Sequence, residues 1–236
     1  ISRKMVLELL ATDQPEREES PDKSSHFWAM ADLLAVDATE ARFDETIKPG
    51  ADNSSKAMRV NLQSCINCNL CVVACREVQV NDVIGMANRG SDSKVVFDFD
   101  DPMGDSTCVT CGECVQACPT GALMPSTVTS EEGKGDSADF DRKVDSVCQY
   151  CGVGCQLTYH VKDERIVYVD GRNGPANESR LCVKGRFGSD YIHHGDRVTK
   201  PLIRLEGARK GIHNDFDPAK PLTHFREASW EEALDF

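Results

Sequence analysis

Twelve cysteines, arranged in three groups of four, limit what this chain can fold into more than any other feature. Residues 108–119 read CVTCGECVQACP, a C-x2-C-x2-C-x3-C spacing with a proline directly after the fourth cysteine. Residues 64–77 read SCINCNLCVVACRE and repeat that spacing. Three thiols at steps of three residues lie on one tight loop and can bind three corners of a cubane [4Fe–4S] cluster, whereas the fourth cannot easily reach the same cube. The doubled run therefore predicts two such clusters.

The two runs also predict which thiols share a cluster. In ferredoxins that carry two clusters, the fourth cysteine of each run ligates the cluster of the other run. We therefore expect crossed ligation and define two sites by it. Site 1 is Cys65, Cys68, Cys71 and Cys118, and site 2 is Cys108, Cys111, Cys114 and Cys75. A zinc ribbon would use two pairs of cysteines instead.

The third group of cysteines lies further along the chain. Residues 148–155 read CQYCGVGC, and one more cysteine follows after a predicted hairpin. We define site 3 as Cys148, Cys151, Cys155 and Cys182. Gly152 and Gly154 allow the backbone to bend close to inorganic sulfide, because no Cβ stands in the way. Spacing alone leaves zinc open here, but the two cluster runs upstream favour a third [4Fe–4S] cluster.

The composition excludes several classes of function. The formal net charge is −12, and each four-thiolate cluster adds roughly −2, so we expect no binding to nucleic-acid phosphates. No apolar run reaches the length of a membrane span, and no signal peptide is visible. All twelve cysteines belong to the three groups, which leaves none for disulfides and indicates a reducing compartment, the cytoplasm.

Apolar spacing and capping signals predict the local elements outside the cysteine runs. We expect helices over Arg3–Ala11 and from a Ser25 cap through Leu34, and strands over Val83–Met86, Lys94–Phe99, Gly121–Met124, Leu157–Val161 and Arg165–Val169. Residues 229–232, SWEE, read as a capping box that opens another helix. Because the chain begins at Ile1 and stops at Phe236 inside that helix, we expect it to be a piece of a longer polypeptide.

Four motifs in the second half of the chain carry a resemblance to a known family. They are CQYCGVGC, LCVKGRFG at Leu181–Gly188, HGDRVTKPLIR at His194–Arg204 and ASWEEAL at Ala228–Leu234. In this order they resemble the start of the molybdopterin oxidoreductase domain, most of all that of molybdenum- or tungsten-dependent formate dehydrogenases. Residues 58–123, which hold the doubled run, are similar to the ferredoxin domain fused ahead of it in soluble NAD-dependent formate dehydrogenases. Related modules occur in respiratory NADH dehydrogenase and in hydrogenase complexes.

The resemblance implies a set of cofactors and partners. It implies that site 3 binds a [4Fe–4S] cluster beside a bis-molybdopterin guanine dinucleotide with Mo or W, held mostly by residues beyond this chain. It places Lys184 between that cluster and the pterin, with a role in electron transfer. It further implies a [2Fe–2S] cluster upstream, and a beta subunit with iron–sulfur clusters, FMN and NAD. Formate and CO2 would be the substrates, in either direction, and no catalytic residue lies within these 236 residues.

The expected fold class is α+β, with a ferredoxin-like two-[4Fe–4S] domain followed by the small, β-rich, cluster-binding start of a molybdopterin oxidoreductase domain. The expected parts are a helical N-terminal segment at 1–55, the ferredoxin-type domain at 56–126, a linker at 127–145, and the incomplete [4Fe–4S] part of the molybdopterin domain at 146–236. The linker assignment rests on its Gly, Ser and acidic residues without periodicity.

The sequence differs from the related proteins in two stretches, and three alternative functions are considered for it. Residues 13–37 contain no cysteine, whereas a corresponding stretch of the respiratory relatives binds a further cluster through one His and three Cys. Gly207–Arg226 is longer than expected and is interpreted as a surface loop. The main alternative is a non-catalytic iron–sulfur subunit of a respiratory NADH dehydrogenase or hydrogenase complex. An assimilatory nitrate reductase shares the CGVGC motif, but the fused two-cluster domain argues against it. A zinc-bearing binding module is the third alternative.

Overall fold

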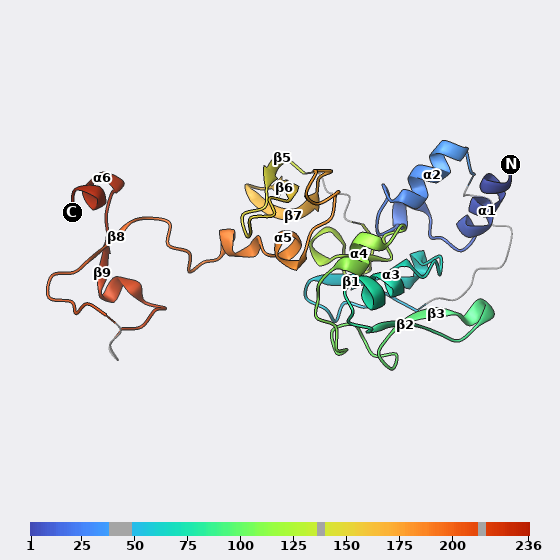
Figure 1. Ribbon diagram of the computed structural model, residues 1–236, viewed down its shortest axis with the longest axis horizontal. Helices are drawn as coiled ribbons and strands as arrows, with labels where there is room; N and C mark the ends of the chain where they lie inside the picture. Colours follow the sequence, from blue (N-terminus) through green and yellow to red (C-terminus); the bar gives the residue numbers. More distant parts are fainter. Residues whose placement is uncertain (38–48, 136–139, 212–215) are drawn as a thin grey trace. The chain divides into compact units, whose positions relative to one another are not determined.

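The computed structural model describes residues 1–37, 49–135, 140–211 and 216–236, which form two compact units, Ile1–Ser189 and Asp190–Phe236 (Figure 1). The unit boundary falls inside the part expected at 146–236. Residues 38–48 of the expected N-terminal segment, 136–139 of the expected linker and 212–215 of Gly207–Arg226 lie outside the described residues. Within the described ranges, no helix combines the length and the apolar character that crossing a membrane requires.

Short helices and small antiparallel sheets confirm the expected α+β class. The α-helices are α1 Ser2–Ala11, α2 His26–Leu34, α3 Leu70–Val73, α4 Glu113–Ala117, α5 Val183–Phe187 and α6 Trp230–Asp235. The 3₁₀ turns are η1 Arg17–Glu19, η2 Leu62–Ser64, η4 Gly90–Asp92, η5 Ser126–Val128, η6 Asp190–His193 and η7 Pro221–Thr223, and η3, Ala74–Val78, is a π-helical turn. The strands are β1 Met58–Val60, β2 Ile84–Ala87, β3 Lys94–Phe97, β4 Leu123–Pro125, β5 Arg142–Val147, β6 Gln156–Lys162, β7 Arg165–Gly171, β8 Leu202–Arg204 and β9 Phe225–Glu227.

The two predicted N-terminal helices are confirmed. Ser25 caps α2, since its Oγ accepts a hydrogen bond from the Trp28 backbone N–H at 3.4 Å. Helices α1 and α2 bury Ala11, Phe27, Trp28 and Ala31 against one another. The backbone N–H of Phe27 donates to the carbonyl of Pro119 at 2.9 Å. This helical segment is therefore attached to the chain one residue beyond the last cysteine of the second run.

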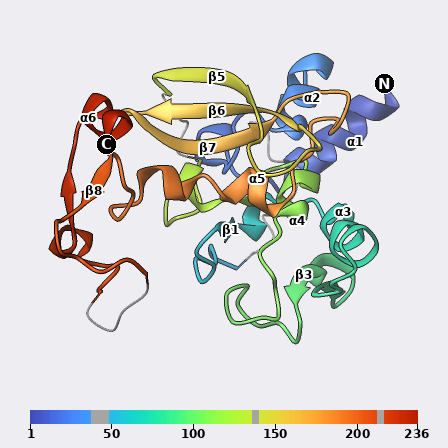
Figure 2. The same ribbon diagram turned by 60° about the vertical axis from the view of Figure 1, so that its left-hand side comes forward.

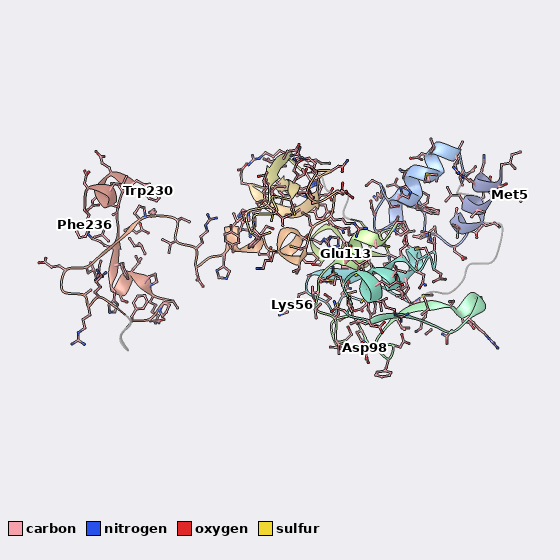
Figure 3. The ribbon with its side chains drawn as sticks, viewed as in Figure 1. Met5, Lys56, Asp98, Glu113, Trp230 and Phe236 are labelled. Carbon is pink, nitrogen blue, oxygen red and sulfur yellow. The ribbon has the colours of Figure 1, made fainter. Side chains whose placement is uncertain are left out.

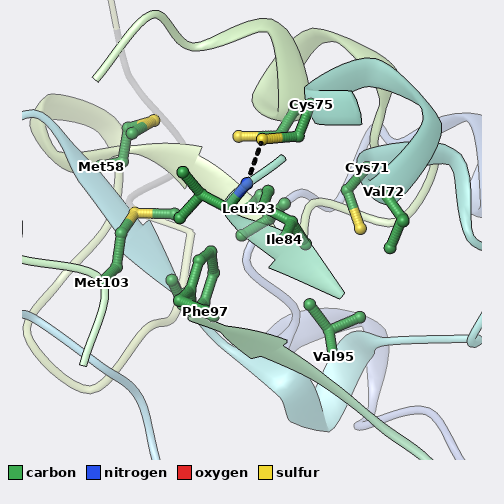
Figure 4. Close-up of a cluster of buried hydrophobic side chains, with 12 residues drawn as sticks. Met58, Cys71, Val72, Cys75, Ile84, Val95, Phe97, Met103 and Leu123 are labelled. Carbon is green, nitrogen blue, oxygen red and sulfur yellow. Dashed lines mark hydrogen bonds between the residues drawn. The ribbon is translucent and has the colours of Figure 1, made fainter. Parts of the chain in front are cut away.

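The core of the dicluster region consists of apolar side chains from two small sheets and two short helices. Strand β1 pairs with β4, and β2 pairs with β3 in a hairpin, both antiparallel. Figure 4 shows the buried side chains that meet between them. They are Met58, Val60, Val72, Val83, Ile84, Val95, Phe97, Met103 and Leu123, together with the thiol-bearing Cys71, Cys75 and Cys114. Because three cysteines belong to this core, the apolar packing that stabilises the fold also positions their thiols.

A three-stranded antiparallel sheet, β5-β6-β7, carries the third group of cysteines (Figure 2). The predicted hairpin is confirmed as β6 and β7, whose inner side chains Leu157 and Val169 are buried with Leu181. Strand β5 begins at Arg142, inside the segment expected to be a linker. Its side chains are exposed almost throughout, so burial imposes no alternation that the sequence could display.

The second unit is a β8–β9 pair with a terminal helix. Ser229 Oγ accepts a hydrogen bond from the Glu232 backbone N–H at 3.1 Å, which confirms the predicted cap of α6. The Glu232 carboxylate instead binds Arg226 at 2.5 Å, and this hydrogen bond lowers the pKa of Glu232. The described part of Gly207–Arg226 contains η7 and the start of β9.

Candidate iron–sulfur centres

The two cysteine runs adopt the same backbone conformation. Asn67 and Thr110, each between the first and second cysteine of its run, have φ of 52° and 56°. Asn69 and Gly112, each just before a helix, have φ of 68° and 77°. A left-handed residue inserted in a tight loop turns successive backbone N–H groups toward its inner side, where they attract anions. The sequence repeat is therefore matched by a repeated anion-binding loop.

Backbone N–H groups in these loops donate to cysteine sulfur. The N–H of Asn67 lies 3.4 Å from Cys65 Sγ, and the N–H of Thr110 lies 3.4 Å from Cys108 Sγ. A third donor, the N–H of Val83, lies 3.4 Å from Cys75 Sγ (Figure 4). Such hydrogen bonds stabilise a thiolate ligand and tune the reduction potential of a bound cluster. The donor pattern thus fits the cofactor that the sequence predicts.

The thiols of site 1 lie close enough to affect one another. The pKa of Cys71 is raised to about 12, first by burial and then by the neighbouring thiols Cys118, Cys65 and Cys68 in that order. Cys118 comes from the second run and the other three from the first. The structure therefore brings the fourth cysteine of the second run to the first three of the other.

Site 2 shows the mirror arrangement. Burial raises the pKa of Cys114, and Cys108 and Cys111 are the next causes, followed by Cys71 and Cys75. Burial also raises the pKa of Cys108, with Cys111 and then Cys75 as its thiol neighbours. Cys75, the fourth cysteine of the first run, thus lies among the thiols of the second run. The influence of Cys71 on Cys114 indicates that sites 1 and 2 adjoin.

Site 3 lies where β5 passes into β6. The backbone N–H of Cys148 donates to the carbonyl of Cys155 at 2.8 Å, which closes the loop that holds three of the four cysteines. Burial is the largest cause that raises the pKa of Cys155, and the thiols Cys148, Cys151 and Cys182 also raise it, in that order. A Cβ on Gly185 of α5 would lie 3.7 Å from Cys148 Sγ, so this helix approaches the thiols through a glycine. The other three thiols predicted for site 3 therefore lie near Cys155.

Across the residues that the structure describes, no three His, Cys, Asp or Glu side chains converge as ligands of one metal ion do. In a cubane each thiolate binds a different iron, so its four ligands stand apart around the cube.

Lys184 lies on α5, two residues after Cys182, which is the residue that precedes the helix. Its side chain is exposed, while its carbonyl accepts the backbone N–H of Gly188 at 2.9 Å. The ammonium group is therefore on the surface of the described part of the chain.

Sequence reasoning missed a polar network between α4 and the start of α5. Glu113, labelled in Figure 3, is buried on α4, and its carboxylate binds Arg180 Nη1 at 2.6 Å. Gln116 Nε2 donates to Glu113 Oε1 at 3.1 Å, and Gln116 Oε1 accepts the backbone N–H of Leu181 at 3.0 Å. Arg186, only 8% exposed, completes the network. The only sequence signal was the RF that follows CVKG, and nothing in it indicated a partner 70 residues upstream.

Comparisons with known proteins agree with this geometry. Residues 64–122 match the family described as "4Fe-4S dicluster domain". Residues 141–194 match the family described as "Molybdopterin oxidoreductase Fe4S4 domain". The chain therefore contains a 4Fe-4S dicluster domain followed by a molybdopterin oxidoreductase Fe4S4 domain. The first domain match contains sites 1 and 2, and the second contains site 3.

Two curated relatives extend the likeness over most of the chain. "Probable oxidoreductase YjgC" of Bacillus subtilis is 34% identical over 218 residues, which cover 78% of this chain and 20% of the relative. "Putative formate dehydrogenase SH0748" of Staphylococcus haemolyticus is 29% identical over 231 residues, or 83% of this chain and 22% of the relative. The chain thus spans about a fifth of the length of these relatives.

A solved structure of an "NAD+-reducing [NiFe]-hydrogenase in the H2-reduced state" is also similar. It is 25% identical, with a TM-score of 0.46, and the match covers 57% of this chain and 58% of that one.

Proposed function

We propose that this molybdopterin-family segment carries electrons within the catalytic subunit of a cytoplasmic, NAD-dependent formate dehydrogenase. The observation that supports this most is the order of three four-thiol sites, two in a dicluster domain and one in the Fe4S4 domain. The formate dehydrogenase name of a relative supports the choice of substrate. The proposal includes a Mo or W bis-pterin centre and a [2Fe–2S] cluster elsewhere in the subunit, and a partner subunit with FMN, NAD and iron–sulfur clusters.

The proposed ligands are the three thiol sets defined above. When bound, each [4Fe–4S] cluster accepts and releases one electron. The chain's own contribution is to hold the thiols in place, to supply N–H groups to sulfur, and to exclude water from the inner ligands. Cys71, Cys75 and Cys114 are buried, whereas Cys68, Cys151 and Cys182 are exposed. Cys71, Cys75 and Cys114 belong to one buried core, which suits transfer between sites 1 and 2.

The intact enzyme is expected to reduce NAD+ with formate. The test isolates the complete subunit with its flavin partner and measures formate-dependent NADH formation, with Mo, W and iron analysis of the same sample. NADH formation with Mo or W present supports the proposal. Full iron loading without Mo or W favours the non-catalytic electron-transfer subunit, and turnover of nitrate instead of formate contradicts the choice of substrate.

Lys184→Ala is expected to leave the metals bound while slowing reduction of site 3 by formate about tenfold. The reason is that a cation in a partly dry gap lowers the energy of an extra electron on a neighbouring centre. Lys184→Arg keeps the charge but changes the shape of the side chain, so its rate of site 3 reduction is expected to fall between those of the wild type and Lys184→Ala. Lys162→Ala, an exposed lysine at the end of β6, is the matched control. Stopped-flow reduction at equal metal content gives the rates, and an unchanged rate in Lys184→Ala would assign the lysine a structural role only.

A further inference from the structure

Arg186 connects the segments that hold sites 2 and 3. Its Nη1 donates to the carbonyl of Cys111 at 3.2 Å, and its Nη2 donates to the carbonyl of Leu181 at 3.0 Å. Cys111 belongs to site 2, and Leu181 directly precedes Cys182 of site 3. Nη2 also donates to Gln116 Oε1 at 2.5 Å. A single guanidinium therefore binds a backbone carbonyl of site 2 and the backbone carbonyl of the residue that precedes Cys182 of site 3.

The environment of this guanidinium is poor in hydrogen-bonded counter-charge. The three acceptors named above are neutral carbonyl and amide oxygens. The Glu113 carboxylate of the network is bound by Arg180. Glu113, Arg180 and Arg186 together therefore carry one excess positive charge. A buried charge is costly unless an opposite charge compensates for it. The clusters proposed for sites 2 and 3 would each bring roughly two negative charges, which makes them the natural counter-charges.

The packing around Arg186 holds its charge in place. Its neighbour Phe187 packs against the core of the dicluster region, and the guanidinium lies 5.9 Å from the centre of the Phe187 ring. Gly112 allows this approach, because a Cβ there would lie 2.4 Å from Arg186 Nη1. The cation is thus fixed between two ligand-bearing segments by hydrogen bonds and by apolar contact.

We propose that Arg186 is a positioning residue for electron transfer between sites 2 and 3, which fixes their separation and favours the reduced state of both clusters. This inference rests on the proposed clusters but not on formate as the substrate. A cation at this place stabilises the extra electron on either neighbouring cluster by Coulomb attraction. The backbone carbonyls that Arg186 binds belong to Cys111 of site 2 and to Leu181 next to site 3, so site 1 is expected to be affected less.

The test measures the reduction potentials of the clusters in the complete subunit by EPR-monitored redox titration. Arg186→Gln removes the charge and is expected to make reduction of the clusters in sites 2 and 3 about tenfold less favourable, a shift of about 59 mV downward. Arg186→Lys keeps the charge but loses the planar guanidinium, so its reduction equilibria for sites 2 and 3 are expected to stay within about threefold of wild type. Arg142→Gln removes an exposed arginine of β5 that is paired with Glu164, and it is expected to leave the reduction potentials of the clusters unchanged. The signal of site 1 is identified by its loss in Cys118→Ala.

The outcomes separate this inference from the proposed function. Wild-type protein without clusters in sites 2 and 3 would overturn the proposed function and this inference together. Clusters present, with unchanged potentials in Arg186→Gln, would overturn this inference alone. If Arg186→Gln fails to assemble, Arg186→Lys decides: normal assembly with wild-type potentials supports the role of the charge. A downward shift in Arg186→Lys as large as the one expected for Arg186→Gln would contradict the inference. Failure of Arg186→Lys to assemble would contradict it as well.

Discussion

Cys118→Ala is expected to remove or damage the cluster of site 1 and to leave that of site 2 intact, although Cys118 belongs to the second run. The physical reason is that Cys118 neighbours Cys71 in the fold, where its thiol contributes to the raised pKa of Cys71. Without the fourth thiolate, one corner of the cube has no protein ligand. Iron is therefore expected to fall by about one to four atoms per subunit, since a cubane holds four.

The mirror variant provides the matched control. Cys75→Ala is expected to damage site 2 and to spare site 1, because Cys75 lies among the thiols of the second run. Iron and sulfide analysis, together with the EPR signals of the reduced protein, distinguishes the two variants. If Cys118→Ala damages only the cluster of Cys108, Cys111 and Cys114, the crossed assignment is wrong.

The cysteine spacing predicted more of the candidate sites than any other signal, because each step in the motif dictates a local loop. Steps of three residues allow a tight turn with left-handed residues, and the structure has them at Asn67 and Thr110. Capping signals worked for the same reason, since Ser25 and Ser229 bond to backbone groups three residues away. Interactions of this length are fully specified by a short stretch of sequence.

The features that could not be predicted depend on distant partners or on weak local signals. Strand β1 has three residues, too few to show a period, and exists because it pairs with β4. Strand β5 is exposed, so its sequence resembles a linker. The network of Glu113, Gln116 and Arg186 joins segments about 70 residues apart. Its members read as ordinary helix-surface residues until the fold buries them.

Gly112 is the backbone position on which this network depends. Its φ of 77° lies in the left-handed region, which costs a residue with a Cβ about 1–2 kcal/mol. A Cβ there would also meet Arg186 Nη1 at 2.4 Å and Phe187 Cε2 at 2.8 Å. The arginine would have to move, and a hydrogen bond to a charged group is worth about 1.5–3 kcal/mol.

Gly112→Ala is therefore expected to destabilise the contact between α4 and α5 by about 3 kcal/mol in total, from backbone strain and lost hydrogen bonds. Gly90→Ala is the matched control, because Gly90 also has a positive φ, 67°, but nothing lies within 4 Å of its added Cβ. It should show the backbone cost alone. Hydrogen exchange of the amides in Val183–Phe187, followed by mass spectrometry, is expected to accelerate about a hundredfold in Gly112→Ala. Exchange of that helix as slow as in Gly90→Ala would mean that Arg186 does not hold α4 and α5 together.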